Sequence, residues 1–102
     1  MKVIKTTVAT RPNTDIRFNP DLQTDLHLEM RQSQEEMLAD GRIISIIGTT
    51  SEDRLTITEV RIFASIDDYI YNRSLFNEFF KTGLEYMANN GITETVSLAF
   101  EE

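Results

Sequence analysis

The segment from Ser65 to Gly91 constrains this chain more than any other part of its sequence. It contains six of the nine aromatic residues, and it carries a helix-capping signal at each end. Ser65 with Asp68 three residues later resembles a capping box, and Gly91 tolerates the positive φ at which many helices end. We therefore expect one long helix over residues 66–90.

The apolar surface of this expected helix is wider than one core requires. On a helical wheel, one group of side chains forms an ordinary core stripe: Tyr69, Phe76, Phe80, Leu84 and Met87. A second group forms a separate flank: Tyr71, Leu75, Phe79 and Tyr86. Either the other helix of the chain covers this flank, or a second subunit does.

The rest of the chain divides into four further segments. Residues 2–10 and 92–100 alternate apolar and polar side chains and predict strands, and residues 42–64 predict a β-hairpin with a polar turn. Residues 20–40 fit a helix, with Pro20 at its first position and Gly41 as its stop. Alternation of Leu26, Leu28 and Met30 leaves a strand over residues 24–32 open, but only the helix explains both ends.

This order is strand, helix, strand, strand, helix, strand. It predicts a single α+β domain over residues 1–102 with a ferredoxin-like βαββαβ fold. Right-handed crossovers place both helices on one face of a four-stranded antiparallel sheet.

The second arm of the hairpin has apolar residues on both faces. Leu55, Ile57 and Phe63 share one face, while Val60, Ile62 and Ala64 share the other. Either a bulge near Thr58 and Glu59 corrects the register, or both faces are partly buried. The second possibility predicts a homodimer or larger homo-oligomer. We expect these residues at its interface: Tyr71, Leu75, Phe79, Tyr86, Leu55, Ile57 and Phe63.

Composition excludes several classes of function. The net charge is −7 and there is no dense basic patch, which argues against nucleic-acid binding. No apolar run approaches the roughly 20 residues that a membrane-spanning helix needs. The absence of cysteine removes disulfides and thiolate metal sites and favours a cytoplasmic location.

The element order, the size and the two-sided hairpin resemble the dimeric α/β-barrel group, which includes the antibiotic-biosynthesis-monooxygenase-like domains. The resemblance implies that two ferredoxin-like chains pack sheet against sheet. The stretch Thr7–Asp15 is also similar to small uncharacterised proteins of marine phages and ocean metagenomes, which would imply the host cytoplasm or a virion as the location.

Members of the first group that degrade heme or form quinones use a His, Trp or Asn between helices and sheet. This chain has no Trp, and its one histidine, His27, falls on the first predicted helix. Asn72 and Asn77 fall on the second, where asparagine is weak evidence for catalysis. We therefore expect no catalytic residue and no cofactor.

His27 also lacks a second His or Cys with which to bind a transition metal, so no metal site is predicted. One cluster could bind a small acidic ligand near the start of the second helix, with Arg11 or Arg17 beside it: Tyr69, Tyr71, Asn72 and Arg73. The alternative is that these residues form the rim of a subunit interface.

Two hypotheses follow from the sequence. The first is a non-enzymatic, self-associating domain with a phage accessory or virion-associated role. The second is a small-molecule-binding domain, or a cofactor-independent monooxygenase-like enzyme, that uses the space between helices and sheet.

Overall fold

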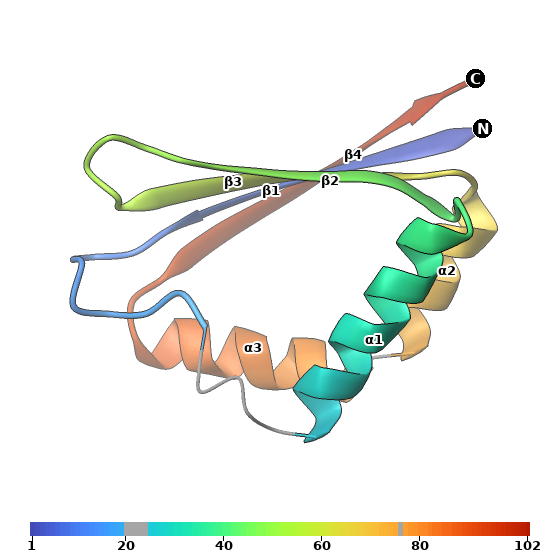
Figure 1. The fold of residues 1–102 in the computed structure, drawn as a ribbon. Helices are drawn as coiled ribbons and strands as arrows, with labels where there is room; N and C mark the ends of the chain where they lie inside the picture. Colours follow the sequence, from blue (N-terminus) through green and yellow to red (C-terminus); the bar gives the residue numbers. More distant parts are fainter. Residues whose placement is uncertain (20–24, 76) are drawn as a thin grey trace.

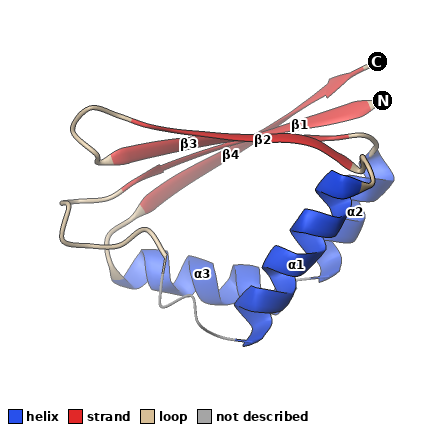
Figure 2. Cartoon of the chain, in the orientation of Figure 1, coloured by secondary structure: helices blue, strands red, loops and turns tan. Residues whose placement is uncertain are grey.

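In the part of the chain that the structure describes, the fold is an antiparallel sheet of four strands with three helices on one side (Figure 1; Figure 2). The computed structural model describes residues 1–19, 25–75 and 77–102, with the side chains of residues 26, 78 and 79 outside that description. Its elements are β1 (Lys2–Thr10), α1 (Asp25–Ala39), β2 (Ile43–Thr50), β3 (Thr56–Phe63), α2 (Ile66–Leu75), α3 (Asn77–Asn89) and β4 (Thr93–Glu101). The strand order β2-β3-β1-β4 confirms the ferredoxin-like prediction.

The first helix is confirmed over Asp25–Ala39, which excludes a strand there. Its predicted start at Pro20 lies outside the described residues. The amide of Asp40 still donates to the carbonyl of Glu36 at 3.0 Å, and Gly41 then has a φ of +85°. Gly41 therefore ends the helix as the sequence predicts, because a residue without Cβ adopts this backbone conformation without strain.

The prediction of one continuous helix over residues 66–90 is wrong. Two helices, α2 and α3, occupy this segment and run in different directions (Figure 1). In the last turn of α2 the hydroxyl of Ser74 donates to the carbonyls of Ile70 at 2.8 Å and Tyr71 at 3.3 Å. Such bonds compete for the acceptors of the helix ladder and favour a bend or an end. Helical periodicity alone did not reveal the break between α2 and α3.

The predicted cap at the start of this segment is present. The hydroxyl of Ser65 accepts from the amide of Asp68 at 3.1 Å and donates to its carboxylate at 2.8 Å. At the other end the amide of Ile92 donates to the carbonyl of Met87 at 2.9 Å. Both ends of the α2–α3 segment are therefore closed by hydrogen bonds that the sequence indicates.

The irregularity of the hairpin lies in its first arm. β3 pairs with β1 without interruption from Thr56 to Phe63, so the predicted bulge near Thr58 and Glu59 is wrong. The register shift lies in β2 between Ile43 and Ser45. Both faces of β3 are half-buried over most of its length, which is the other possibility that the sequence left open.

The buried core is one row of side chains across three strands, covered by α1. Val3 of β1 pairs with Phe63 of β3, and Phe63 pairs with Ile43 of β2. Met37 of α1 packs on this row, and all four side chains are at most 1% exposed. The ring of Tyr69 from α2 meets Phe63 edge to face, with centroids 5.5 Å apart. This row fixes which face of the sheet turns toward the helices.

The two faces of the sheet differ in charge. Alternation from the core row puts Lys5, Glu59, Arg61 and Glu94 on the helix-facing side. The outer side has these residues: Ile4, Thr6, Val8, Thr10, Ser45, Ile47, Thr49, Thr56, Thr58, Val60, Ile62, Thr93, Thr95, Ser97 and Ala99. Its charged members, Lys2 and Glu101, face each other at one end of the sheet. The charged side is thus the one that the helices cover.

Two glycines provide a matched test of backbone conformation. A Cβ added at Gly41 or at Gly83 would meet no atom within 4 Å, but only Gly41 has a positive φ. Gly41→Ala should therefore destabilise the fold by about 1–2 kcal/mol. Gly83→Ala, inside α3, should stabilise it by roughly 0.8–1.0 kcal/mol. Urea denaturation measures both, and shifts of the same sign would contradict the assigned conformation at Gly41.

Candidate ligand site between the helices and the sheet

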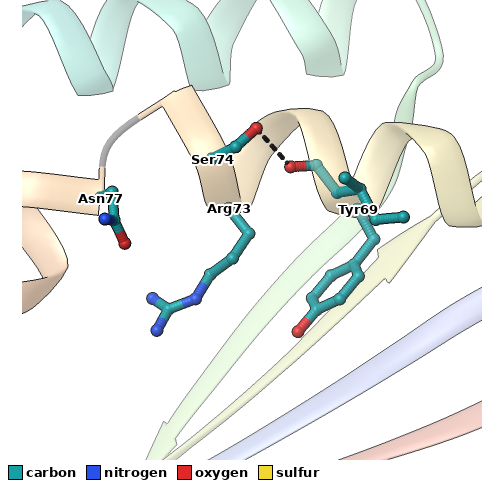
Figure 3. Close-up of a pocket in the computed structure, with 5 residues that line it drawn as sticks. Tyr69, Arg73, Ser74 and Asn77 are labelled. Carbon is teal, nitrogen blue, oxygen red and sulfur yellow. Dashed lines mark hydrogen bonds between the residues drawn. The ribbon is translucent and has the colours of Figure 1, made fainter.

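One face of α2 points toward the sheet and borders a cavity. Tyr69 and Arg73, one helical turn apart, extend their side chains toward the strands (Figure 3). With Ile70, Ser74 and Asn77 they line a cavity of about 360 Å³ that is open to solvent, and all of its lining residues belong to α2 and the start of α3. This volume falls within the range of small-molecule sites in proteins.

Two cations converge on one aromatic ring beside this cavity. The guanidinium carbon of Arg73 lies 4.4 Å from the centroid of Phe80 in α3, and the Nζ of Lys5 in β1 lies 5.5 Å from it. Both distances are within the range of cation–π attraction. Phe80 therefore brings together charged groups from α2 and from the sheet.

A third cation lies next to Lys5 on the same side of the sheet. Arg61 is the register partner of Lys5 across β1 and β3. Its Nε donates to the Glu59 carboxylate at 3.1 Å, and a terminal guanidinium nitrogen lies 3.0 Å from the same oxygen. This ion pair neutralises Arg61 in part and holds its guanidinium against the sheet.

The surroundings of Lys5 disfavour its charge. Burial lowers the pKa of the Lys5 ammonium, and the positive charges of Arg61 and Arg73 lower it further. The carboxylates of Glu59 and Glu94 act in the opposite direction, but the pKa remains below its usual value of 10.5. The folded chain therefore keeps a cation where burial and neighbouring charge both oppose it.

The apolar side chains of β4 border the same region. Leu98 pairs with Lys5, and Phe100 pairs with Val3, so both share the helix-facing side of the sheet. Nevertheless Leu98 is 41% exposed and Phe100 is 56% exposed. α1 packs on β2, and α2 packs on β1 and β3, while β4 is left largely uncovered. The site therefore has a charged centre and an apolar border.

The structure separates the four predicted ligand residues. Tyr69 and Arg73 lie together at the cavity. Asn72 is 6% exposed and donates to the sulfur of Met37 at 3.8 Å, so it turns toward α1. Tyr71 is 46% exposed and lies under the guanidinium of Arg42 at 5.4 Å. The four residues are neighbours in sequence, but successive helical positions point in different directions.

Arg11, one of the two arginines expected beside this cluster, is engaged elsewhere. Arg11 donates to the carbonyls of Arg54 and Ile16, each at 2.9 Å, and stacks on Phe18 at 4.6 Å. It thereby joins the loop after β1 to the β2–β3 turn. Sequence reasoning missed Lys5 and Arg61, which take this place. The strand register could have revealed them, because it places Lys5 on the same side of the sheet as Val3 and pairs it with Arg61.

The predicted interface residues fall into different environments. Phe63 belongs to the core, and Ile57 shares its helix-facing side of β3. Leu55 is half-buried in the turn before β3, and Leu75 is exposed on α2. The Tyr86 hydroxyl donates to the carbonyl of Arg17 at 2.7 Å, which ties α3 to the loop after β1. The side chain of Phe79 lies outside the described residues.

His27 lies on α1, as the sequence predicts, and is 8% exposed. Over the described residues there is no group of three or more His, Cys, Asp or Glu side chains placed to hold a metal ion. In the same part of the chain, no helix has the length and apolar character needed to cross a bilayer.

No protein-family model matches the sequence, and a search of curated proteins finds no match. Solved structures share the fold. SnoaB, a cofactor-independent oxygenase from Streptomyces nogalater, has a TM-score of 0.58 at 10% identity, covering 99% of this chain and 93% of its own. A candidate antibiotic biosynthesis monooxygenase from Deinococcus radiodurans has a TM-score of 0.57 at 7% identity, covering 98% and 92%.

A dimeric ferredoxin-like protein from an uncultured marine organism has a TM-score of 0.55 at 10% identity, covering 99% of this chain and 97% of its own. At these identities the likeness establishes the fold. The chain is thus an α+β protein with a ferredoxin-like fold, and its structural neighbours include a protein described as dimeric and ferredoxin-like and another described as an antibiotic biosynthesis monooxygenase.

The position of Lys5 predicts that its positive charge lowers the stability of the folded chain. Because its pKa is lower in the folded chain than in the unfolded chain, charging Lys5 costs folding free energy at neutral pH. This cost disappears as the pH rises from the folded pKa toward 10.5. Lys5→Met should therefore raise stability at pH 7 by up to about 1 kcal/mol, since solvent screens part of the effect.

Urea denaturation at pH 7 and pH 10 measures this difference, which should shrink at the higher pH. Lys81→Met, at an exposed position of α3, is the control and should change little. A lower urea midpoint for Lys5→Met at pH 7 would mean that the contact with Phe80 outweighs burial and repulsion.

Proposed function

We propose that this chain is a homodimeric small-molecule-binding domain of the antibiotic-biosynthesis-monooxygenase-like type. Its ligand occupies the space between the helices and the sheet. The observation that carries the proposal is the distribution of charge over the sheet. Charged side chains lie on the side that the helices cover, while the outer side is uncharged except at one end.

The outer side of the sheet supports the dimer. The solvent-facing side of a sheet in a monomer is normally polar, and charged side chains contribute most to its hydration. Here the central outer positions hold Ile4, Val8, Val60 and Ile62, and Ile47 is 60% exposed at the edge. Burying such side chains against a second copy stabilises association by roughly 1.5–3 kcal/mol each, before the entropic cost of association.

The helix-facing side supports the ligand. A structural core does not normally hold two cations such as Lys5 and Arg73 at one aromatic ring, with Arg61 beside Lys5, because like charges repel. The 360 Å³ cavity beside Arg73 supplies space for a small molecule. The names of SnoaB and the Deinococcus radiodurans protein describe activity on small molecules, which agrees with this use of the fold.

A cofactor-independent oxygenase is the second candidate, and the lowered pKa of Lys5 favours it. A lysine of lowered pKa loses its proton at a lower pH than a free lysine, and its neutral amine accepts a proton from an acidic C–H or O–H group of a bound molecule. Arg73 would then stabilise the anion formed. The non-enzymatic phage accessory role that the sequence favoured remains a prediction, without support from the structural neighbours.

Two substitutions of matched chemistry test the dimer. Ile47→Glu puts a charge on the outer side of the sheet, and Leu75→Glu puts one on the exposed flank of α2. Both wild-type side chains are about half exposed, at 60% and 47%, so neither change should unfold a single chain. Sedimentation equilibrium should report a wild-type dimer, a monomeric Ile47→Glu and a dimeric Leu75→Glu.

Circular dichroism should show an unchanged fold for both variants. Dissociation by Leu75→Glu alone would move the interface to the helical flank predicted from the sequence. A wild-type chain that remains monomeric at millimolar concentration would refute the dimer.

A further inference from the structure

We propose that the ligand of this site is an apolar carboxylate. Its carboxylate group binds between Lys5 and Arg73, and its apolar body lies along Leu98 and Phe100 of β4. This inference rests on the proposed function, since it specifies the chemistry of a ligand in the same site. It follows from the arrangement of cations, ring and apolar side chains rather than from the names of similar proteins.

The chain has a net charge of −7, yet Lys5, Arg61 and Arg73 lie near one another between α2 and the sheet, where Glu59 and Glu94 offset only part of their charge. Arg61 is paired with Glu59, with a nitrogen–oxygen distance of 3.0 Å. Over the described residues, neither Lys5 nor Arg73 takes part in an ion pair. Glu59 and Glu94 act on the charge of Lys5 without forming an ion pair with it. In this part of the chain the two cations therefore favour an anion from outside.

The positions of Arg73 and Lys5 at the Phe80 ring also suit a carboxylate. The guanidinium of Arg73 lies over the face of Phe80, with 4.4 Å between its carbon and the ring centroid. A guanidinium held near a ring still has in-plane N–H groups, which match the two oxygens of a carboxylate. Lys5 lies near the same ring and supplies a second, more compact donor. The site therefore offers one anionic group a bidentate contact from Arg73 and a single contact from Lys5.

The pKa of Lys5 is shifted in the direction that a bound anion would reverse. Burial and the positive charges of Arg61 and Arg73 hold the pKa of Lys5 below 10.5, despite Glu59 and Glu94. A bound anion would oppose these effects, because an opposite charge nearby favours the ammonium form. Ligand binding would thus recover part of the free energy that the empty site costs.

The surface next to Lys5 is apolar. Leu98 is its register partner on β4, so the two side chains lie beside each other on the same side of the sheet. Phe100 continues this apolar surface, and both residues are more than 40% exposed. A fully hydrated anion such as phosphate would leave this surface uncovered. A carboxylate with an apolar body covers it.

The test compares two probes that differ in charge and little else. 2-Naphthoate carries a carboxylate, and 2-naphthamide carries a neutral amide on the same ring. Isothermal titration calorimetry on the wild-type chain should give a dissociation constant at least tenfold lower for 2-naphthoate, because hydrogen bonds to a charged group are stronger than those to a neutral amide. Inorganic phosphate should bind more weakly than 2-naphthoate.

Two variants should remove this preference. Lys5→Met and Arg73→Gln should each weaken 2-naphthoate binding about tenfold and leave 2-naphthamide almost unchanged. Arg31→Gln, at an exposed position of α1, is the control and should behave as wild type. Circular dichroism verifies that each variant is folded.

A second measurement needs no variant. The pKa of Lys5, followed by side-chain NMR in the wild-type chain, should rise when 2-naphthoate saturates the site and stay constant with 2-naphthamide.

The failures of the two proposals can be distinguished. Equal affinity for both probes would overturn the carboxylate inference but leave a ligand-binding domain. Absence of saturable binding by both probes would overturn the ligand part of the proposed function as well. Preferential binding of phosphate would assign the cations to a hydrophilic anion instead.

Discussion

One apolar row across the sheet determines how the rest of this structure is arranged. Val3, Phe63 and Ile43 lie side by side on three strands, and Met37 of α1 covers them. The next row toward the far end of β1 is Lys5 with Arg61. Helices can pack closely on the first row, but closing on the second would bury Lys5, which forms no ion pair in the described part of the chain. The molecule is therefore tightly packed at one end of the sheet and more open at the other.

This division explains why the candidate site and the core are adjacent. Tyr69 belongs to both, because its ring packs on Phe63 while its side chain also borders the cavity that Arg73 lines. Phe80 has a comparable position between Lys5 and Arg73. A rigid core can thus hold the polar groups of the site in place, which is what recognition of a specific ligand requires. The cost is a small core for a chain of this length.

The sequence predicts the architecture well and the site only in part. Strand alternation, the Ser65–Asp68 cap and the Gly41 stop are local signals, and each appears in the structure. The break between α2 and α3 was missed because the bonds of Ser74 to the helix backbone are invisible to periodicity. Arg73 was predicted because helix positions are easily placed. Lys5 and Arg61 required the pairing register of distant strands, which a single sequence does not reveal.

The bulge in β2 has a consequence for how this protein can change in evolution. The extra residue at Ile44 lets Ile43 and Ile46 share the helix-facing side, while Ile47 turns outward. Deleting or inserting one residue downstream of the bulge would exchange the two sides of β2, and the outer surface would lose Ile47. Point substitutions in this strand are therefore more easily tolerated than changes in its length. Among descendants of this sequence, the number of residues between Gly41 and the β2–β3 turn should vary less than their identity.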